Sequence, residues 1–320
     1  MKQITDFPSV PLALLPTPLY KLENLSRETG KNIYIKRDDM TGAALGGNKV
    51  RKLEFLLADA RAKGADVVLT AGGPQSNHAM LTAACAAKLG MSAILVLKKR
   101  GVLSGGNLIL DEIFGAEVRF VDTDSYDGVY AEMERIMTDL RAQGHTPYFI
   151  PVGGSVPLGC LGYVNCAKEI ANQAEDLGVD FDIIVSATGS GGTYAGLTLG
   201  AKLFLPGTAS VGIGVCDDPF EAISLDLMEG TAALLEADVP VDPADIRIHY
   251  HIGPGYAIPS PEGAAAVKRL ARTEGILVDP VYTGKALAGF FQLLEEDSAF
   301  RDAENILFLH TGGAGALFAV

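Results

Sequence analysis

Short runs of β-branched and aromatic residues alternate with longer stretches of helical period through this chain, and that alternation limits the fold more than any other feature. The runs predict strands at residues 33–36, 67–70, 93–98, 117–121, 147–151, 182–186, 210–215, 276–278 and 305–309. Stretches of helical period lie between them, among them 52–63, 77–89, 125–142, 160–177, 193–204, 261–273 and 284–295. Elements that alternate at these lengths form right-handed βαβ units around mostly parallel sheets, so the sequence predicts an α/β fold.

Charge and cysteine usage limit the partners and the compartment. The 320 residues carry a formal net charge of −13, which argues against a nucleic-acid partner because such a partner needs a basic surface. Three prolines break the apolar start of the chain, and five glycines interrupt the uncharged stretch 183–201, so we expect neither a signal peptide nor a membrane span. We interpret that stretch as a strand, a loop and a helix. The chain has no CxxC pair, so we expect no metal site and a cytoplasmic protein whose thiols are buried and reduced: Cys85, Cys160, Cys166 and Cys216.

Several predicted strands end in a turn rich in glycine or hydroxyl residues just before the next helix. These turns are TAGGPQSNH at 70–78, SATGSGGT at 186–193 and HTGG at 310–313, and they hold several of the chain's 37 glycines. In open α/β sheets, ligands bind outside the carboxyl ends of the strands, where helix N-termini offer unpaired N–H groups. We therefore expect a ligand site at these turns.

The most prominent candidate is the turn formed by Thr188, Gly189, Ser190, Gly191, Gly192 and Thr193. Its backbone N–H groups and hydroxyls can surround a phosphate. The dinucleotide fingerprint is absent, because Tyr194 stands where the third glycine would be, and the chain has no Walker A loop. A second interpretation accounts for the turn equally well: its small residues allow a helix to pack closely on a sheet.

Lys49 is the candidate nucleophile. It follows Gly46 and Gly47, which allow the backbone to come close to a ligand, and it precedes a predicted helix. A desolvated lysine can form a Schiff base with a carbonyl cofactor. Lys52 lies three residues on, on the same helical face, and could bind a phosphate.

The segment Ser76, Asn77, His78 stands where a predicted strand gives way to a helix. Ser76 is a good N-cap, and the same geometry offers a hydroxyl, an amide and free N–H groups to a substrate carboxylate. A Ser–His hydrolase is not favoured, because no G-x-S-x-G elbow surrounds Ser76.

Four further side chains are weaker candidates. Tyr256 and Tyr282 lie in turn-rich segments, where a tyrosine is less plainly a core residue. His249 and His251 have the spacing of two ligands on one face of a strand, but no carboxylate or cysteine cluster supports a metal site. We interpret these histidines as lining one face of a short strand.

Taken together, the motifs YIKRDD, GGNKVRKLEFL, GGPQSNH, IPVGGSVPLGCLGY, TGSGGTYAG, DPVYTGKA and HTGG resemble the D-cysteine desulfhydrase and 1-aminocyclopropane-1-carboxylate deaminase family of pyridoxal-phosphate enzymes. The resemblance runs from about Thr17 to the end of the chain. It implies two open, twisted, mostly parallel sheets of the tryptophan-synthase-β type (fold type II). It also implies a large cofactor domain of residues 1–51 and 156–320, a small inserted domain of residues 52–155, and a homodimer.

The resemblance also assigns roles residue by residue. Lys49 matches the lysine that binds the cofactor covalently and later moves the α-proton, while Lys52 and the turn 188–193 match the phosphate-binding elements. Ser76 and Asn77 match residues near the substrate carboxylate and the cofactor's phenolic oxygen, with Ser76 also a proton relay, and His78 is a further candidate for binding the substrate. Tyr256 and Tyr282 match the tyrosines that flank substrate and ring.

Two positions separate the branches of that family. The cyclopropane deaminases have Glu and Leu where this chain has Thr283 and Thr311, and the desulfhydrases have Thr at both. A threonine at the pyridine nitrogen leaves that nitrogen neutral, which suffices to expel a thiol. The resemblance therefore favours a lyase that converts D-cysteine to pyruvate, ammonia and sulfide.

Other functions stay open at this level. An L-cysteate sulfo-lyase or a cyclopropane deaminase shares the core motifs, and a non-catalytic phosphate or nucleotide binder would use the turn 188–193 without needing Lys49. The basic run 98–100 is interpreted as a solvated loop rather than a sulfonate clamp.

Overall fold

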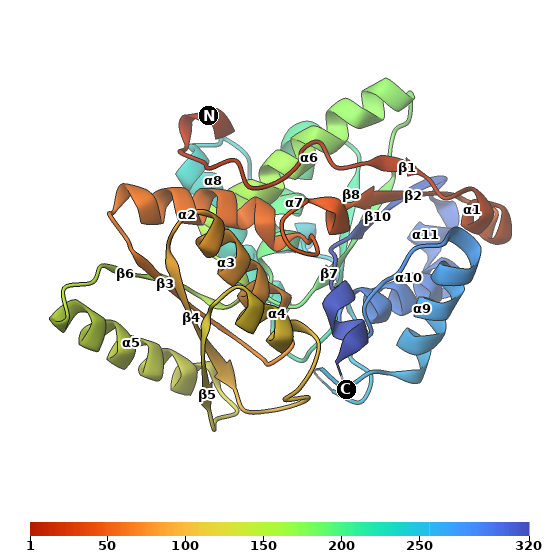
Figure 1. Cartoon of the computed structure of the whole chain (residues 1–320). Helices are drawn as coiled ribbons and strands as arrows, with labels where there is room; N and C mark the ends of the chain where they lie inside the picture. Colours follow the sequence, from red (N-terminus) through yellow and green to blue (C-terminus); the bar gives the residue numbers. More distant parts are fainter. Residues whose placement is uncertain (256, 320) are drawn as a thin grey trace.

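The larger of two sheets joins strands from both ends of the chain (Figure 1). The computed structural model describes residues 1–255 and 257–319. Within them, the strand order is β1 (Leu19–Lys21), β2 (Asn32–Arg37), β10 (Asn305–His310), β7 (Ile183–Thr188), β8 (Ala209–Gly214) and β9 (Ile248–Tyr250). All neighbours are parallel except β1, which pairs antiparallel with β2. The carboxyl ends of β10, β7 and β8 therefore meet at one edge.

A second, wholly parallel sheet has the order β5 (Glu117–Val121), β4 (Ser92–Lys98), β3 (Val67–Gly72) and β6 (Pro147–Ile150). Its strands all come from residues 67–150, between β2 and β7 of the larger sheet. Two mostly parallel sheets confirm the predicted fold class. The strands of the second sheet lie inside the predicted insertion 52–155, whose boundaries stay a prediction.

Helices cover both faces of both sheets. The α-helices are α1 (Glu23–Thr29), α2 (Lys49–Ala62), α3 (Asn77–Lys88), α4 (Asn107–Ile113), α5 (Tyr126–Ala142), α6 (Pro157–Leu177), α7 (Gly192–Phe204), α8 (Phe220–Leu235), α9 (Pro261–Glu274), α10 (Thr283–Glu296) and α11 (Ser298–Asp302). Short 3-10 helices are η1 (Ile4–Asp6), η2 (Asp38–Met40), η3 (Val152–Gly154), η4 (Pro243–Asp245) and η5 (Ala314–Phe318). None of the described helices is long and apolar enough to span a bilayer.

Alternate residues along each strand feed different cores. In β10, Ile306 and Phe308 pack with α9 and α10, whereas Leu307 and Leu309 pack with α6 and α7. In the second sheet, one face packs on α2 and α3 and the other on α5. Burial on both faces explains why these strands are almost wholly apolar in sequence.

One predicted strand does not form. Residues 276–278 join α9 to α10 without a sheet partner, and the carbonyl of Leu277 accepts a hydrogen bond from His310 Nε2 at 2.8 Å instead. The run is apolar because Ile276 and Val278 are buried in the core beside α10, and burial alone gave it the composition of a strand. The interpretation of 183–201 as strand, loop and helix is confirmed by β7 and α7. His249 lies in the short strand β9 as expected, and His251 follows its end.

Candidate active site

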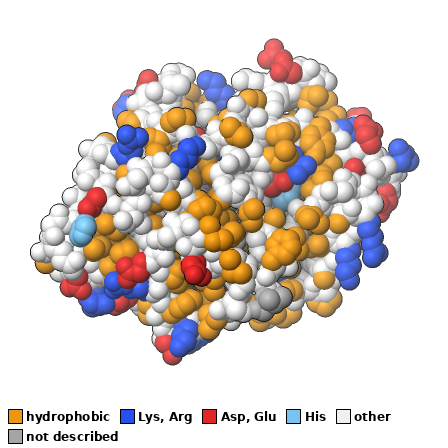
Figure 2. All heavy atoms as spheres, in the orientation of Figure 1, with side chains coloured by type: hydrophobic (Ala, Val, Ile, Leu, Met, Phe, Trp, Pro, Cys, Tyr) orange, Lys and Arg blue, Asp and Glu red, His pale blue; other side chains and the backbone are white. Residues whose placement is uncertain are grey.

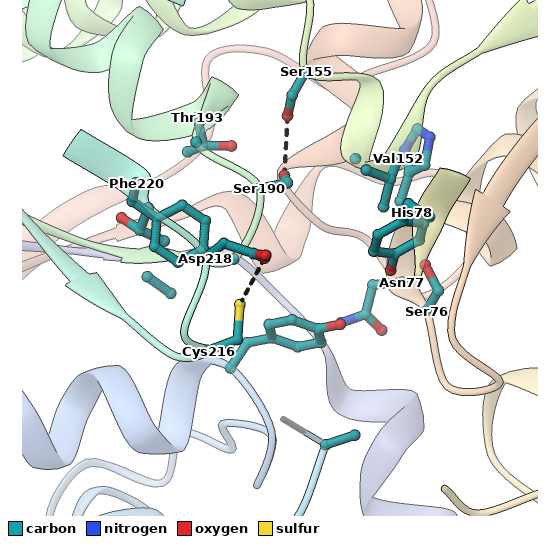
Figure 3. Close-up of a pocket in the computed structure, with 18 of the residues that line it drawn as sticks. Ser76, Asn77, His78, Val152, Ser155, Ser190, Thr193, Cys216, Asp218 and Phe220 are labelled. Carbon is teal, nitrogen blue, oxygen red and sulfur yellow. Dashed lines mark hydrogen bonds between the residues drawn. The ribbon is translucent and has the colours of Figure 1, made fainter. Parts of the chain in front are cut away.

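A cavity of about 750 Å³ lies between the two sheets and receives the segments that follow the carboxyl ends of their strands (Figure 3). Its walls include residues after β3, β4 and β6 on one side and after β7, β8 and β10 on the other. This volume is typical of a site for a cofactor or a drug-sized ligand. The parallel topology therefore brings the glycine-rich turns together as the sequence predicted.

Lys49 is the first residue of α2 and projects into this cavity. The turn before it needs glycine: Gly46 has φ +73°, and a Cβ there would lie 1.8 Å from the carbonyl oxygen of Asp39. The preceding Asn48 donates from Nδ2 to Thr193 Oγ1 at 2.9 Å, which ties the start of α2 to the start of α7. Lys49 Nζ donates to Ser190 Oγ at 3.4 Å.

The environment of Lys49 favours its neutral amine. Burial lowers the pKa of Lys49 well below its ordinary value of 10.5, and the positive charge of Lys52 lowers it further. Burial also lowers the pKa of Lys52, to about 8. The pKa of Lys49 is thus lowered by both burial and a neighbouring cation, and Lys49 is the stronger candidate for a nucleophile or base.

Lys52 stands behind the turn 188–193 rather than in the cavity wall. Its Nζ donates to the carbonyl of Gly153 at 3.1 Å and to Ser155 Oγ at 3.3 Å. Ser155 Oγ donates to Ser190 Oγ at 3.0 Å and accepts from the N–H of Gly192 at 3.3 Å, so it joins the lysine to the turn. A buried cation and a ring of hydroxyls and N–H groups are the chemistry that holds a phosphate.

Asn77 and its neighbours form the N-terminus of α3. Ser76 caps the helix, since its Oγ accepts from the N–H of Ala79 at 3.2 Å. Asn77 is held by α4, because Asn107 Nδ2 donates to Asn77 Oδ1 at 2.8 Å. The imidazole of His78 contacts Thr70 Oγ1 through Nε2 at 2.9 Å, so the part of His78 that suits a carboxylate is its backbone N–H.

A buried carboxylate holds the segment that brings Tyr282 to the cavity wall. Asp279 accepts from the N–H groups of Val281, Tyr282 and Thr283 at 2.7–2.8 Å, and burial raises its pKa. The hydroxyl of Thr283 donates to Asp279 Oδ1 at 2.5 Å. Thr283 therefore points toward Asp279 and is absent from the cavity wall, whereas Tyr282 and Thr311 belong to that wall.

Comparison with known proteins decides the family. The model of the pyridoxal-phosphate dependent enzyme family matches residues 10–312. The chain belongs to the pyridoxal-phosphate dependent enzymes. The resemblance inferred from the motifs is thereby confirmed at the level of this family, and pyridoxal phosphate is the cofactor of this enzyme.

Curated relatives of this pyridoxal-phosphate enzyme share nearly its whole length. It is 46% identical to D-cysteine desulfhydrase of Yersinia enterocolitica (99% of this chain, 97% of the relative). It is 44% identical to D-cysteine desulfhydrase of Klebsiella pneumoniae (100% and 98%). The crystal structure of an ACC deaminase homologue has a TM-score of 0.90 and 43% identity, and covers 98% of this chain and 94% of its own. A fungal L-serine ammonia-lyase from Rhizomucor miehei has a TM-score of 0.70 at 18% identity (94% and 94%), which shows the shared fold alone.

The cavity of this pyridoxal-phosphate enzyme fits the cofactor in two independent ways. The turn 188–193 has no free space for a side chain at two of its glycines: a Cβ at Gly192 would lie 2.7 Å from Lys52 Nζ, and one at Gly189 would lie 3.1 Å from the ring of Tyr282. Behind that turn stands the fully buried Lys52, whose Nζ lies next to Gly192. A crowded backbone turn with a buried lysine behind it indicates a site whose remaining partner is a phosphate.

The structure gathers most of the predicted site residues in one place. The cavity wall contains Lys49, Ser76, Asn77, His78, Thr188, Gly189, Ser190, Gly191, Thr193, Tyr282 and Thr311. Lys52 and Gly192 stand directly behind that wall, and Thr283 is turned away from it. Tyr256 lies outside the described residues. The cysteines are free and buried as expected.

The outer part of the cavity was not predicted from the sequence. Lys98 is the last residue of β4 and lines the cavity, so the interpretation of 98–100 as a solvated loop is wrong for this lysine. Asp218 and Phe220 line the opposite side (Figure 3). Lys98 and Asp218 could have been found from the sequence. They lie at or just after the ends of the expected strands 93–98 and 210–215, and ligands bind at the carboxyl ends of such strands.

Proposed function

We propose that this enzyme eliminates sulfide from D-cysteine, consuming water and releasing pyruvate, ammonia and hydrogen sulfide. The observation that carries the proposal is the placement of Lys49 at the mouth of the turn 188–193, in one cavity with the N-terminus of α3. The curated relatives named D-cysteine desulfhydrase cover the whole chain and support the choice of substrate. The threonines at 283 and 311 support the same branch.

We assign the cofactor's phosphate to the turn 188–193, with the charge of Lys52 behind it and Thr311 at the opposite end of the site. When bound, pyridoxal phosphate supplies a carbonyl that condenses with amino groups and a ring that accepts the electron pair left at the α-carbon. Lys52 offsets the phosphate charge in a molecule whose net charge of −13 repels anions.

Lys49 acts on the α-proton of the substrate. Because its pKa is lowered by burial and by the charge of Lys52, its neutral amine, the form that can accept this proton, is favoured. Ser76, in the same cavity, offers a hydroxyl that can pass a proton to or from the substrate. The sulfur leaves with the electron pair of the Cβ–S bond, and the released enamine hydrolyses to pyruvate and ammonia.

The N-terminus of α3 orients the substrate. The first N–H groups of a helix have no partner inside the helix and carry partial positive charge, so those of Asn77 and His78 suit the substrate carboxylate. The amide of Asn77, fixed by Asn107, is assigned to the cofactor's phenolic oxygen. Tyr282 forms a wall beside Gly189 that confines the ring.

A substrate panel tests the proposal. Purified protein loaded with pyridoxal phosphate should release equal amounts of pyruvate and sulfide from D-cysteine, and the Lys49→Ala variant should release neither. L-Cysteine, L-cysteate and the cyclopropane amino acid serve as competitors. Pyruvate and sulfite from L-cysteate, or 2-oxobutyrate from the cyclopropane acid, with no product from D-cysteine, would overturn the assignment.

We further propose that the enzyme works as a cytoplasmic homodimer. Large apolar side chains are exposed on α4 and on the segments next to it: Ile109 and Ile113 lie in α4, Phe318 lies in η5, and Leu45 lies beside Gly315 of η5. Figure 2 shows hydrophobic side chains gathered over α4 and the C-terminal segment. The N–H of Gly106 donates to the carbonyl of Phe318 at 3.2 Å, so these elements form one surface, which we name the α4 patch. An apolar patch on a folded chain suits a second copy, and four free buried thiols suit a reducing compartment.

A further inference from the structure

The outer part of the active-site cavity is lined by charged residues of both signs: Lys98, Arg100 and Asp124 on one side, and Asp217 and Asp218 on the other. Lys98 ends β4 of the four-stranded sheet, and Asp218 follows β8 of the six-stranded sheet. No ion pair of 4 Å or less joins these two described residues. A cysteine side chain has no group that would use such a pair, so the two charges need another explanation.

Lys98 keeps bonding capacity for a ligand. Its Nζ donates to the backbone carbonyl of Asp124 at 2.8 Å and lies 3.7 Å from the centre of the Tyr126 ring. Neither contact neutralises its charge with a carboxylate. The neighbouring Arg100 differs, because Asp122 and Asp124 both pair with its guanidinium. Burial lowers the pKa of Lys98, and the carboxylates of Asp218 and Asp124 oppose that shift.

Asp218 has the complementary capacity. Within the described part of the chain, its carboxylate accepts only from the thiol of Cys216, at 3.3 Å, and a thiol is a weak donor (Figure 3). Burial raises the pKa of Cys216 to about 12, so that thiol keeps its proton. Asp218 is exposed toward the cavity mouth, and its carboxylate has room for an ammonium group.

We propose that Lys98 and Asp218 form a subsite for a distal amino-acid group, so that the enzyme accepts D-cysteine thioethers whose sulfur substituent ends in both a carboxylate and an ammonium. Lys98 binds the carboxylate and Asp218 binds the ammonium. This inference rests on the proposed function, because the substrate's own α-carboxylate must lie at α3. A cavity of about 750 Å³ has space for such a substrate beside the cofactor.

The reaction at the subsite is the same elimination with a larger leaving group. In D,D-lanthionine, the bond between sulfur and the Cβ next to the bound α-carbon breaks, and the sulfur takes the electron pair and a proton. With one water consumed, the products are pyruvate, ammonia and D-cysteine, and this D-cysteine is itself a substrate of the proposed elimination. No oxidant or further co-reactant is needed.

Four substrates that differ only in the distal group test the subsite. They are D,D-lanthionine, S-(2-carboxyethyl)-D-cysteine, S-(2-aminoethyl)-D-cysteine and S-ethyl-D-cysteine, compared by kcat/KM from initial rates of pyruvate release, before the D-cysteine released from lanthionine accumulates. The intact enzyme should prefer lanthionine to the S-ethyl compound by at least about tenfold. Lys98→Met should lower kcat/KM about tenfold for the two substrates with a distal carboxylate. Asp218→Asn should do so for the two with a distal ammonium.

D-Cysteine is the internal reference, since it has no distal group and both variants should keep its kcat/KM within about twofold. D,D-2,6-diaminopimelate, in which a methylene replaces the sulfur, cannot eliminate and should inhibit the intact enzyme competitively. Its inhibition constant should rise in both variants. Equal losses on D-cysteine and lanthionine, or no preference among the four thioethers, would overturn the subsite. No product from D-cysteine in the intact enzyme would instead overturn the proposed function.

Discussion

At the residue scale, the side chains that indicate the active site lie near the ends of strands. Lys49, Ser76 and Thr188 were predictable because they lie where the chain passes from a strand to a helix, and parallel topology brings such places together. The orientation of Thr283 was not predictable. Its hydroxyl turns toward Asp279, four residues earlier, and motif spacing does not reveal which of two nearby polar groups a side chain will face.

The charge of Lys52 should affect the pH at which Lys49 reacts with a carbonyl compound. Replacing Lys52 by Met in the apoenzyme removes a like charge near Lys49 and keeps the site buried, so the pKa of Lys49 should rise. Only the neutral amine attacks a carbonyl. The pH midpoint for loading with pyridoxal, followed by absorbance, should therefore move to higher pH.

Pyridoxal lacks the phosphate, so this measurement separates the charge of Lys52 from its role in phosphate binding. Lys63→Met is the matched control, because Lys63 is exposed at the end of α2 and pairs with Asp59. A midpoint that stays in place, or moves to lower pH, for Lys52→Met would contradict the electrostatic coupling.

The hydroxyl of Thr283 should contribute to the stability of the fold. Thr283→Val removes the hydroxyl that donates to Asp279 Oδ1 and accepts from the N–H of Asp279 at 2.8 Å. Leaving these buried groups short of a partner should destabilise the fold by about 1–3 kcal/mol. Ser224→Ala deletes a buried hydroxyl that has no partner among the described residues, and its thermal midpoint should barely change. Equal shifts for both variants would argue against a special role for Thr283.

At the element scale, the sequence predicted most strands and helices because the α/β pattern repeats its signals. The prediction failed where an apolar run can arise either from a strand or from burial of a loop in the core. Residues 276–278 are apolar through burial beside α10, and the short antiparallel strand β1 is too brief for a periodic pattern. The crossing of α6 and α7 also cannot be predicted from local sequence, because it depends on which glycine of one helix packs against the backbone of the other.

That crossing predicts the effect of Gly196→Ala. A Cβ at Gly196 in α7 would lie 2.4 Å from the carbonyl oxygen of Cys160 and 2.7 Å from Cβ of Tyr163, both in α6. Backbone must move to admit it, so the cost should be about 3 kcal/mol. Because α7 begins at Gly192 beside Lys52, the same shift should weaken retention of pyridoxal phosphate, measured by dialysis and absorbance.

Gly178→Ala is the comparison. Gly178 follows α6 at φ +65° with nothing within 4 Å of its added Cβ, so only backbone strain of about 1 kcal/mol applies. Its cofactor retention should match the unmodified enzyme. If Gly196→Ala lost no more stability and no more cofactor than Gly178→Ala, the helix crossing would not control the phosphate turn.

At the scale of the whole molecule, the α4 patch and the active site share one helix. Ile109 and Ile113 are exposed on α4, while Asn107 in the same helix is buried and holds Asn77 in the cavity. A second copy seated on the patch would therefore restrain the helix that positions Asn77. Assembly and catalysis should be coupled through these few residues.

This coupling predicts that Ile113→Asp gives a monomer with reduced activity. A carboxylate on a 68% exposed apolar side chain costs the single chain little, but it cannot be buried against a second copy without a partner. Sedimentation should show loss of the dimer, and kcat/KM for D-cysteine should fall about tenfold as α4 loses its restraint on Asn77. Leu177→Asp, at an exposed leucine at the end of α6, should stay dimeric and active. A dimeric Ile113→Asp protein would place the interface elsewhere, and a fully active monomer would show that Asn107 holds Asn77 without help from assembly.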